Sequence, residues 1–143
     1  MFVNLLLGTL VISATVVIHT LGLIALTHAT GRLTDLVRMD GRRSRILAMV
    51  SIVLGLFAIM TVEVWLWAVS HYWLGVVEGF ETALYFSVVS FSTLGYGDVL
   101  PAHHWRLFAG LEGVNGFLLI GWSTAYLIAA GIRIGPFRQG VHF

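Results

Sequence analysis

The segment from Ser92 to Asp98, S-T-L-G-Y-G-D, places two glycines, a threonine hydroxyl and an acid between two long apolar stretches. A cation that crosses an apolar layer needs oxygen ligands in place of its water shell, and backbone carbonyls can supply them. Successive carbonyls can face one axis only if alternate residues take left-handed or otherwise unusual backbone angles, which glycine adopts without strain. We therefore expect Gly95 and Gly97 to align a row of cation ligands, the carbonyls of Thr93, Leu94, Gly95 and Tyr96, with the Thr93 hydroxyl adding a further oxygen.

The composition excludes an ordinary soluble domain. Of the 143 residues, 58% are hydrophobic and only 10% are charged, so a charged surface cannot cover the fold. We predict an all-α membrane protein. Cysteine is absent, which excludes disulfides, thiolate metal sites and cysteine catalysis. No nucleophile–base pair, phosphate loop or metal cluster suggests an enzyme, and we expect no cofactor and no nucleic-acid partner.

Three charge-poor runs are long enough for transmembrane helices, which need roughly 20 residues, at residues 2 to about 27, 46–70 and 105–132. A further helix predicted at 80–92 would be only roughly 18 Å long and too short to span. We divide the chain into three parts. Residues 1–45 contain the first helix and an Arg-rich loop, residues 46–132 form a central module that includes the short helix and the 93–98 segment, and residues 133–143 form a tail.

The positions of the arginines predict the topology. Five of the eight lie in the loop from His28 to Arg45, so this loop is expected to be cytoplasmic and to meet anionic lipid headgroups. A short interfacial helix around Leu33 to Val37, ended by Gly41, is a further expectation for this loop. Arg133 and Arg138 place the C-terminus in the cytoplasm as well. Because the Arg-rich loop follows the first span, the N-terminus is expected to lie outside. The stretch between the second and third spans then starts and ends outside, so it forms a re-entrant loop.

A short helix followed by T-L-G-Y-G-D resembles the pore loop of the tetrameric potassium channels, whose usual signature is T-V-G-Y-G-D. The resemblance covers 46–132 and includes A-L-Y-F-S in the short helix and the P…W after the signature. Leu94 replaces the usual valine at a position that contributes its carbonyl. The resemblance implies a homotetramer with three spans per subunit in a bacterial inner membrane, conducting K⁺ through carbonyl rings of residues 93–97. A weakly selective cation channel and a non-conducting modulatory subunit are the alternatives.

The same resemblance suggests supporting residues. Gly116 matches a hinge position of the inner helix, although close packing explains it equally well. Phe117, Ile120 and Thr124 would turn toward a water-filled cavity. Some family members carry a glutamate where this chain has Val89, which leaves Asp98 to hydrogen-bond with Tyr85 or Trp105.

Several other polar residues stand out in apolar surroundings. Glu63 and Glu112 are the only acids within the spans, at a similar depth of about 10 Å, and structural bracing is expected of them, with Arg106 a candidate partner. His19 is expected to form an interhelical hydrogen bond. Histidines titrate in mild acid, so an outer-mouth proton sensor is predicted at two residues after the signature, His103 and His104.

Overall fold

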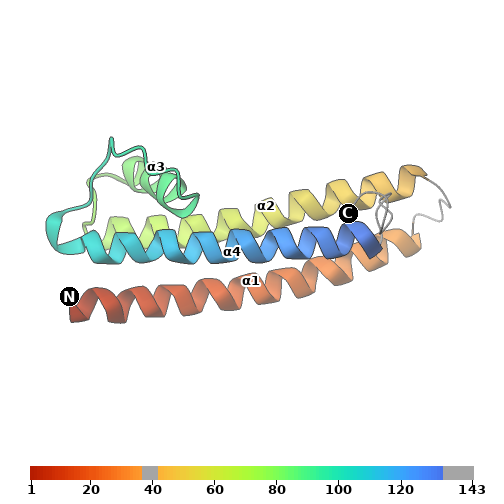
Figure 1. The fold of residues 1–143 in the computed structure, drawn as a ribbon, viewed down its shortest axis with the longest axis horizontal. Coiled ribbons are helices and arrows are strands. Elements are labelled where there is room, and N and C mark those ends of the chain that lie inside the picture. The colour runs from red at the N-terminus through yellow and green to blue at the C-terminus, as the bar shows by residue number, and fades with distance from the viewer. Residues whose placement is uncertain (37–41, 134–143) are drawn as a thin grey trace.

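The computed structural model describes residues 1–36 and 42–133, and the secondary structure in these ranges is helical, with loops at 74–79 and 92–102. The long helices α1, α2 and α4 lie side by side, and α3 lies at the end of the bundle that holds the N-terminus of α1 (Figure 1). The elements are α1 (Phe2–Leu36), α2 (Arg42–Trp73), α3 (Phe80–Phe91), the 3₁₀ turn η1 (His103–Trp105) and α4 (Arg106–Arg133).

The three long helices are each long and apolar enough to cross a membrane, whereas α3 is shorter. This confirms the prediction of an all-helical chain with three candidate spans. Large apolar side chains, whose exposure to water would be unfavourable, are exposed along these helices, for example Phe57 and Leu54 on α2. Such exposure is expected where lipid or another apolar partner covers a helix.

The first helix is longer than its apolar composition predicted. It continues past Thr27 without a break to Leu36, and the hydroxyls of Thr27 and Thr30 donate to carbonyls one turn earlier in the same helix, so these polar side chains are satisfied without interrupting it. The prediction of a separate interfacial helix that begins at Leu33 is therefore wrong for residues 33–36, because these residues belong to α1. Val37, Arg38 and Gly41 lie outside the described residues, as does the tail beyond Arg133.

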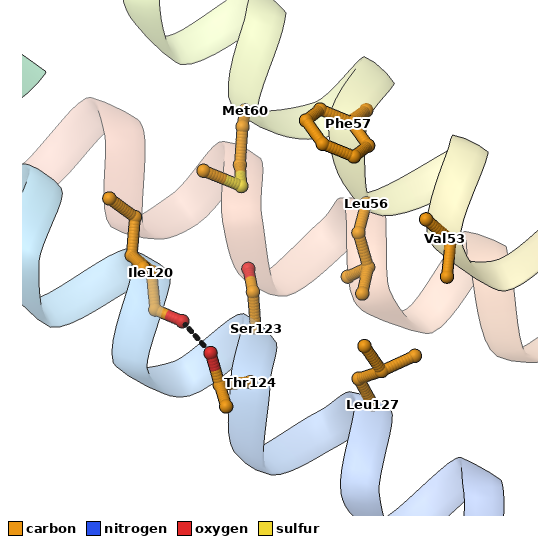
Figure 2. Close-up of a pocket in the computed structure, with 8 residues that line it drawn as sticks. All are labelled: Val53, Leu56, Phe57, Met60, Ile120, Ser123, Thr124 and Leu127. Atoms are coloured by element: carbon orange, nitrogen blue, oxygen red, sulfur yellow. Dashed lines mark hydrogen bonds between the residues drawn. The ribbon is translucent and has the colours of Figure 1, made fainter. Parts of the chain in front are cut away.

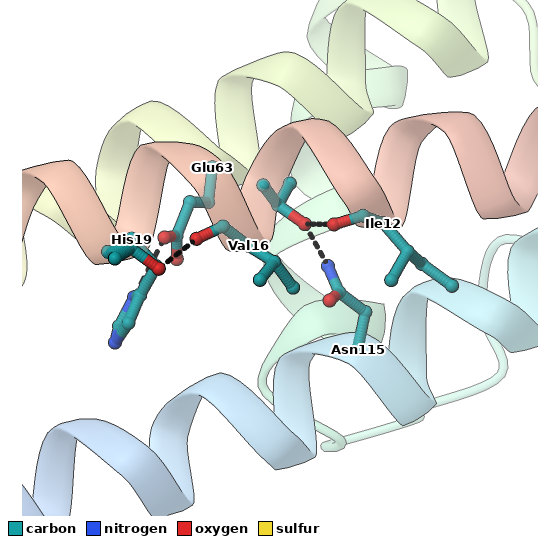
Figure 3. A network of polar contacts seen from close by, with 7 residues as sticks. Ile12, Val16, His19, Glu63 and Asn115 are labelled. Atoms are coloured by element: carbon teal, nitrogen blue, oxygen red, sulfur yellow. Dashed lines mark hydrogen bonds and ion pairs between the residues drawn. The ribbon is translucent and has the colours of Figure 1, made fainter.

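Polar side chains link α1 to both other long helices at membrane depth. His19 of α1 and Glu63 of α2 are fully buried and lie 2.8 Å apart, Nδ1 to Oε1. The Asn115 amide of α4 donates to the Thr15 hydroxyl of α1 at 2.8 Å (Figure 3). Lipid cannot satisfy such groups, so they pair inside the bundle. The interhelical hydrogen bond predicted for His19 is confirmed.

An aromatic cluster positions α3 against the bundle. Phe86 and Phe91 of α3 pack with Trp67 of α2 and Phe108 of α4 in one buried core. The rings of Trp67 and Phe108 lie 5.2 Å apart between centroids, and Trp67 and Phe108 are both fully buried. The short helix is therefore held by the same core that joins α2 to α4.

Candidate functional site

The backbone of the 93–98 segment alternates in handedness. Gly95 and Gly97 have φ of 59° and 76°, and Thr93 has φ of 61°, the only positive φ of a non-glycine among the described residues. Leu94 and Tyr96, which lie between them, do not have a positive φ. Alternation of this kind is what allows consecutive carbonyls to face the same side. The sequence indicated it for the two glycines but not for Thr93, whose type gives no signal for a left-handed backbone.

The segment starts from the C-terminal end of α3. The amides of Thr93 and Leu94 donate to the carbonyls of Ser90 and Val89, each at 3.0 Å, and Gly95 N lies 3.3 Å from the Val89 carbonyl. These bonds satisfy carbonyls that the end of a helix leaves unpaired. The negative end of the α3 dipole thus lies beside Thr93.

The whole segment is exposed in the single chain. All residues from Thr93 to Asp98 are exposed, and a Cβ added at Gly95 or Gly97 would meet no atom within 4 Å. The unusual backbone is therefore not explained by crowding within one subunit.

Asp98 is held by the phenol of Tyr85. The Tyr85 hydroxyl donates to Oδ2 of Asp98 at 2.6 Å, and this hydrogen bond lowers the pKa of the Asp98 carboxyl below its ordinary value of 3.8. Of the two predicted donors, the structure pairs Asp98 with Tyr85. The Trp105 ring instead packs 5.9 Å from the ring of Phe108.

Removal of this phenol gives a first prediction. Tyr85→Phe should raise the pKa of Asp98, because the donor that favours the carboxylate is lost. In the parent, the bond's contribution to stability is complete above pH 3.8 and is lost as the pH falls through the lowered pKa. Titration of the Asp98 carboxyl carbon by NMR measures the shift. Trp105→Phe is the control, and a larger pKa change in that variant would assign the donor to Trp105.

The chain returns after the segment to the place where α3 begins. The Ala102 amide donates to the Val76 carbonyl at 2.9 Å. This hydrogen bond joins the residues that precede α3 to those that follow the 93–98 segment. His103 and His104 follow on η1, and both are exposed. The side-chain amide of Asn4 in α1 donates to the His104 carbonyl at 3.0 Å. The turn η1 that carries the two histidines directly precedes α4, at the end of the bundle where the 93–98 segment lies (Figure 1).

Gly116 packs directly on the end of α3. It is buried, and a Cβ at this position would overlap the Phe91 carbonyl oxygen and lie 2.7 Å from its carbonyl carbon. Of the two explanations for Gly116, the structure thus favours close packing. Gly110 and Gly121 of α4 differ from Gly116, because a Cβ at either position would meet no atom within 4 Å, whereas one at Gly113 would lie 3.5 Å from the Ser90 carbonyl oxygen.

The residues predicted to face a cavity lie on the open side of α4. Phe117 is 72% exposed, Thr124 is exposed and Ile120 is half-buried. The Thr124 hydroxyl donates to the Ile120 carbonyl at 2.8 Å (Figure 2). Ile120 and Thr124 also line an apolar crevice between α2 and α4. Its other lining residues are Val53, Leu56, Phe57, Met60, Ser123 and Leu127.

Glu112 is fully buried behind α3 and pairs with residues that sequence reasoning missed. His71 Nε2 lies 2.6 Å from its Oε2, and Ser87 Oγ lies 2.5 Å from its Oε1. Among the described residues, both buried glutamates have a histidine as partner, so Arg106, which is exposed, is not the partner that was predicted. A histidine in the last turn of an apolar span was the available signal for His71.

The comparison with protein families gave one match. Residues 59–133, slightly more than half of the chain, match a family described as "Ion channel". The match includes the C-terminal part of α2 from residue 59 onward, all of α3 and α4, and the 93–98 segment between them. Comparisons with curated proteins and with solved structures gave no match.

Proposed function

Because this chain belongs to the ion channel family and has three helices suited to spanning a membrane, we propose that it is a potassium-selective channel. It conducts K⁺ passively as a homotetramer. The observation that carries the proposal is the alternation of left-handed φ at Thr93, Gly95 and Gly97 within T-L-G-Y-G-D. This segment is the proposed filter.

The proposed filter works by replacing water around the ion. The carbonyls of Thr93, Leu94, Gly95 and Tyr96 from four copies form stacked rings, and the Thr93 hydroxyl adds an innermost ring. One chain supplies a quarter of each ring, which is consistent with the exposure of all these residues in the single subunit. The C-terminal end of α3 aims its partial negative charge at a cation below the rings.

The inner helix completes the pathway. Phe117 and Thr124, with Ile120 between them, face the water-filled cavity below the rings in the assembled channel. Val114 and Leu118, exposed by 67% and 60% in one chain, are apolar side chains that neighbouring copies or lipid must cover.

The orientation follows from charge. The N-terminus and the proposed filter face outward in a bacterial inner membrane, and α3 re-enters the bilayer from that side. Arg32, Arg43 and Arg45 are exposed at the other end of the bundle, where they contact anionic headgroups. His103 and His104 remain the proposed proton sensor of the outer mouth, since both are accessible.

Flux measurements on purified protein in liposomes test the proposal. A K⁺ gradient should drive flux that a Na⁺ gradient of the same size does not, because the ring oxygens replace the hydration shell of K⁺ better than that of Na⁺. Protein-free liposomes with and without a potassium ionophore are the controls. Equal fluxes of both ions would favour a weakly selective cation channel, and absence of flux would favour a non-conducting subunit.

A further inference from the structure

The buried contacts of Glu112 join three helices at one point. Oε2 faces His71 of α2, and Oε1 faces Ser87 of α3, which also lies 2.9 Å from the Val64 carbonyl of α2. His71, Ser87 and Glu112 are all 0% exposed. The hydrogens in this chain of contacts can be counted from the chemistry of each group.

The hydrogen on His71 belongs to Nε2. The other ring nitrogen, Nδ1, is buried and has no hydrogen-bond partner among the described residues. The rings of Phe86 and Phe108 stand edge-on to the imidazole, at 5.1 and 5.4 Å. A hydrogen on Nδ1 would be a buried donor without an acceptor, which is unfavourable. The imidazole is therefore neutral and donates from Nε2 to Oε2 of Glu112.

Ser87 has one hydroxyl hydrogen and two oxygen neighbours. The Val64 carbonyl can only accept. If Ser87 donated to Glu112, the 2.9 Å contact between Ser87 Oγ and the Val64 oxygen would contain no hydrogen, and two lone pairs would face each other. If Ser87 donates to Val64, Glu112 must donate to Ser87. Only the second arrangement places a hydrogen in every contact, and it requires a protonated Glu112.

The charge count agrees with this assignment. With His71 neutral, an ionised Glu112 would be a buried carboxylate without a counter-charge, because the described part of the chain places no arginine in an ion pair with it. Arg106, which precedes Glu112 on α4, and Glu81, which precedes Ser87 on α3, are both exposed. A buried uncompensated charge is strongly unfavourable, whereas a neutral acid with both oxygens bonded is not.

We propose that Glu112 is a neutral carboxylic acid, and that the chain His71 to Glu112 to Ser87 to Val64 positions α3 between α2 and α4. Ser87 lies six residues before Thr93 on the helix that ends at the proposed filter, so this chain sets the position of that helix. Glu112 touches no ion and acts through α3. The positioning role rests on the proposed function, but the protonation state does not.

Infrared spectroscopy of the purified full-length protein tests the protonation directly. The parent-minus-Glu112→Gln difference spectrum at neutral pH should contain the C=O stretching band of a protonated carboxylic acid. A difference spectrum with carboxylate bands alone would overturn the proposal. Ser87→Ala in protein labelled with ¹³C-glutamate provides a second measurement should Glu112→Gln not fold. It should shift the acid band, because the O–H loses its acceptor, and an unshifted band would also overturn it.

Flux separates positioning from mere stability. Glu112→Gln keeps a donor to Ser87 and an acceptor for His71, so it should retain most of the parent's K⁺ flux. Glu112→Leu, of similar size, leaves the His71 N–H without an acceptor and should lower the flux by about tenfold. Equal losses of K⁺ flux in both variants would contradict the proposed series of hydrogen bonds with a neutral Glu112. A parent protein without flux would contradict the proposed function and leave the infrared result valid.

Discussion

Gly95→Ala should abolish potassium flux, while Gly75→Ala should leave ion selectivity unchanged. Gly95 and Gly75 have φ of 59° and 66°, and a Cβ at either position meets no atom within 4 Å. An added methyl group therefore opposes the same left-handed backbone at both sites, by about 1–2 kcal/mol. Only at Gly95 does relief of that strain turn a proposed ligand carbonyl, and it does so in every copy of the assembly.

The measurement is K⁺ and Na⁺ flux in liposomes, together with the thermal unfolding of each purified variant. Both variants should unfold at similar temperatures, because the strain is the same. Normal potassium selectivity in Gly95→Ala would refute the carbonyl mechanism. Loss of selectivity in Gly75→Ala as well would show that strain anywhere near α3 is enough, and that the proposed filter has no special part in it.

Gly116→Ala should both destabilise the protein and abolish flux. The methyl group would overlap the Phe91 carbonyl oxygen, which is backbone and cannot rotate away, so the end of α3 must move. Overpacking of this kind costs about 1–3 kcal/mol. The first residue of the proposed filter is two positions after Phe91, so the displacement reaches the rings directly.

Gly110→Ala is the matched control on the same helix. A Cβ at Gly110 meets nothing within 4 Å, so alanine should stabilise α4 by about 1 kcal/mol through helix propensity. The two substitutions should thus shift thermal unfolding in opposite directions. If Gly116 served only as a hinge, the Gly116→Ala variant would also be more stable than the parent, and only the opening of the channel would change. Single-channel recording distinguishes altered opening from a distorted filter.

The 93–98 segment was the most predictable part of the chain. Glycine at alternate positions has a direct conformational meaning, so residue type alone was enough to predict the left-handed backbone of Gly95 and Gly97. Thr93 could not be predicted in the same way, because a threonine takes φ of 61° only when its surroundings impose it. The family resemblance left two candidate donors for Asp98, and the geometry of α3 was needed to choose between them.

The buried pairs show where sequence reasoning ends. Glu112 was recognisable as a buried acid because charge is rare in an apolar span. Its partner His71 lies 41 positions earlier, and helical periodicity relates residues within one helix but not the rotation of one helix against another. Arg106 was an attractive partner by charge alone. The end of α1 was misjudged because threonines that bond to their own helix do not interrupt it.

The links of α1 also impose an order on biosynthesis. Asn4 and Thr15 each bond to a residue 100 positions further along the chain. Translation adds about 5–20 residues per second, so those partners are synthesised roughly 5–20 seconds after the residues of α1. His19 waits less, since Glu63 follows after 44 residues. Nascent α1 must therefore be sheltered by the insertion machinery or by α2 until α4 enters the bilayer.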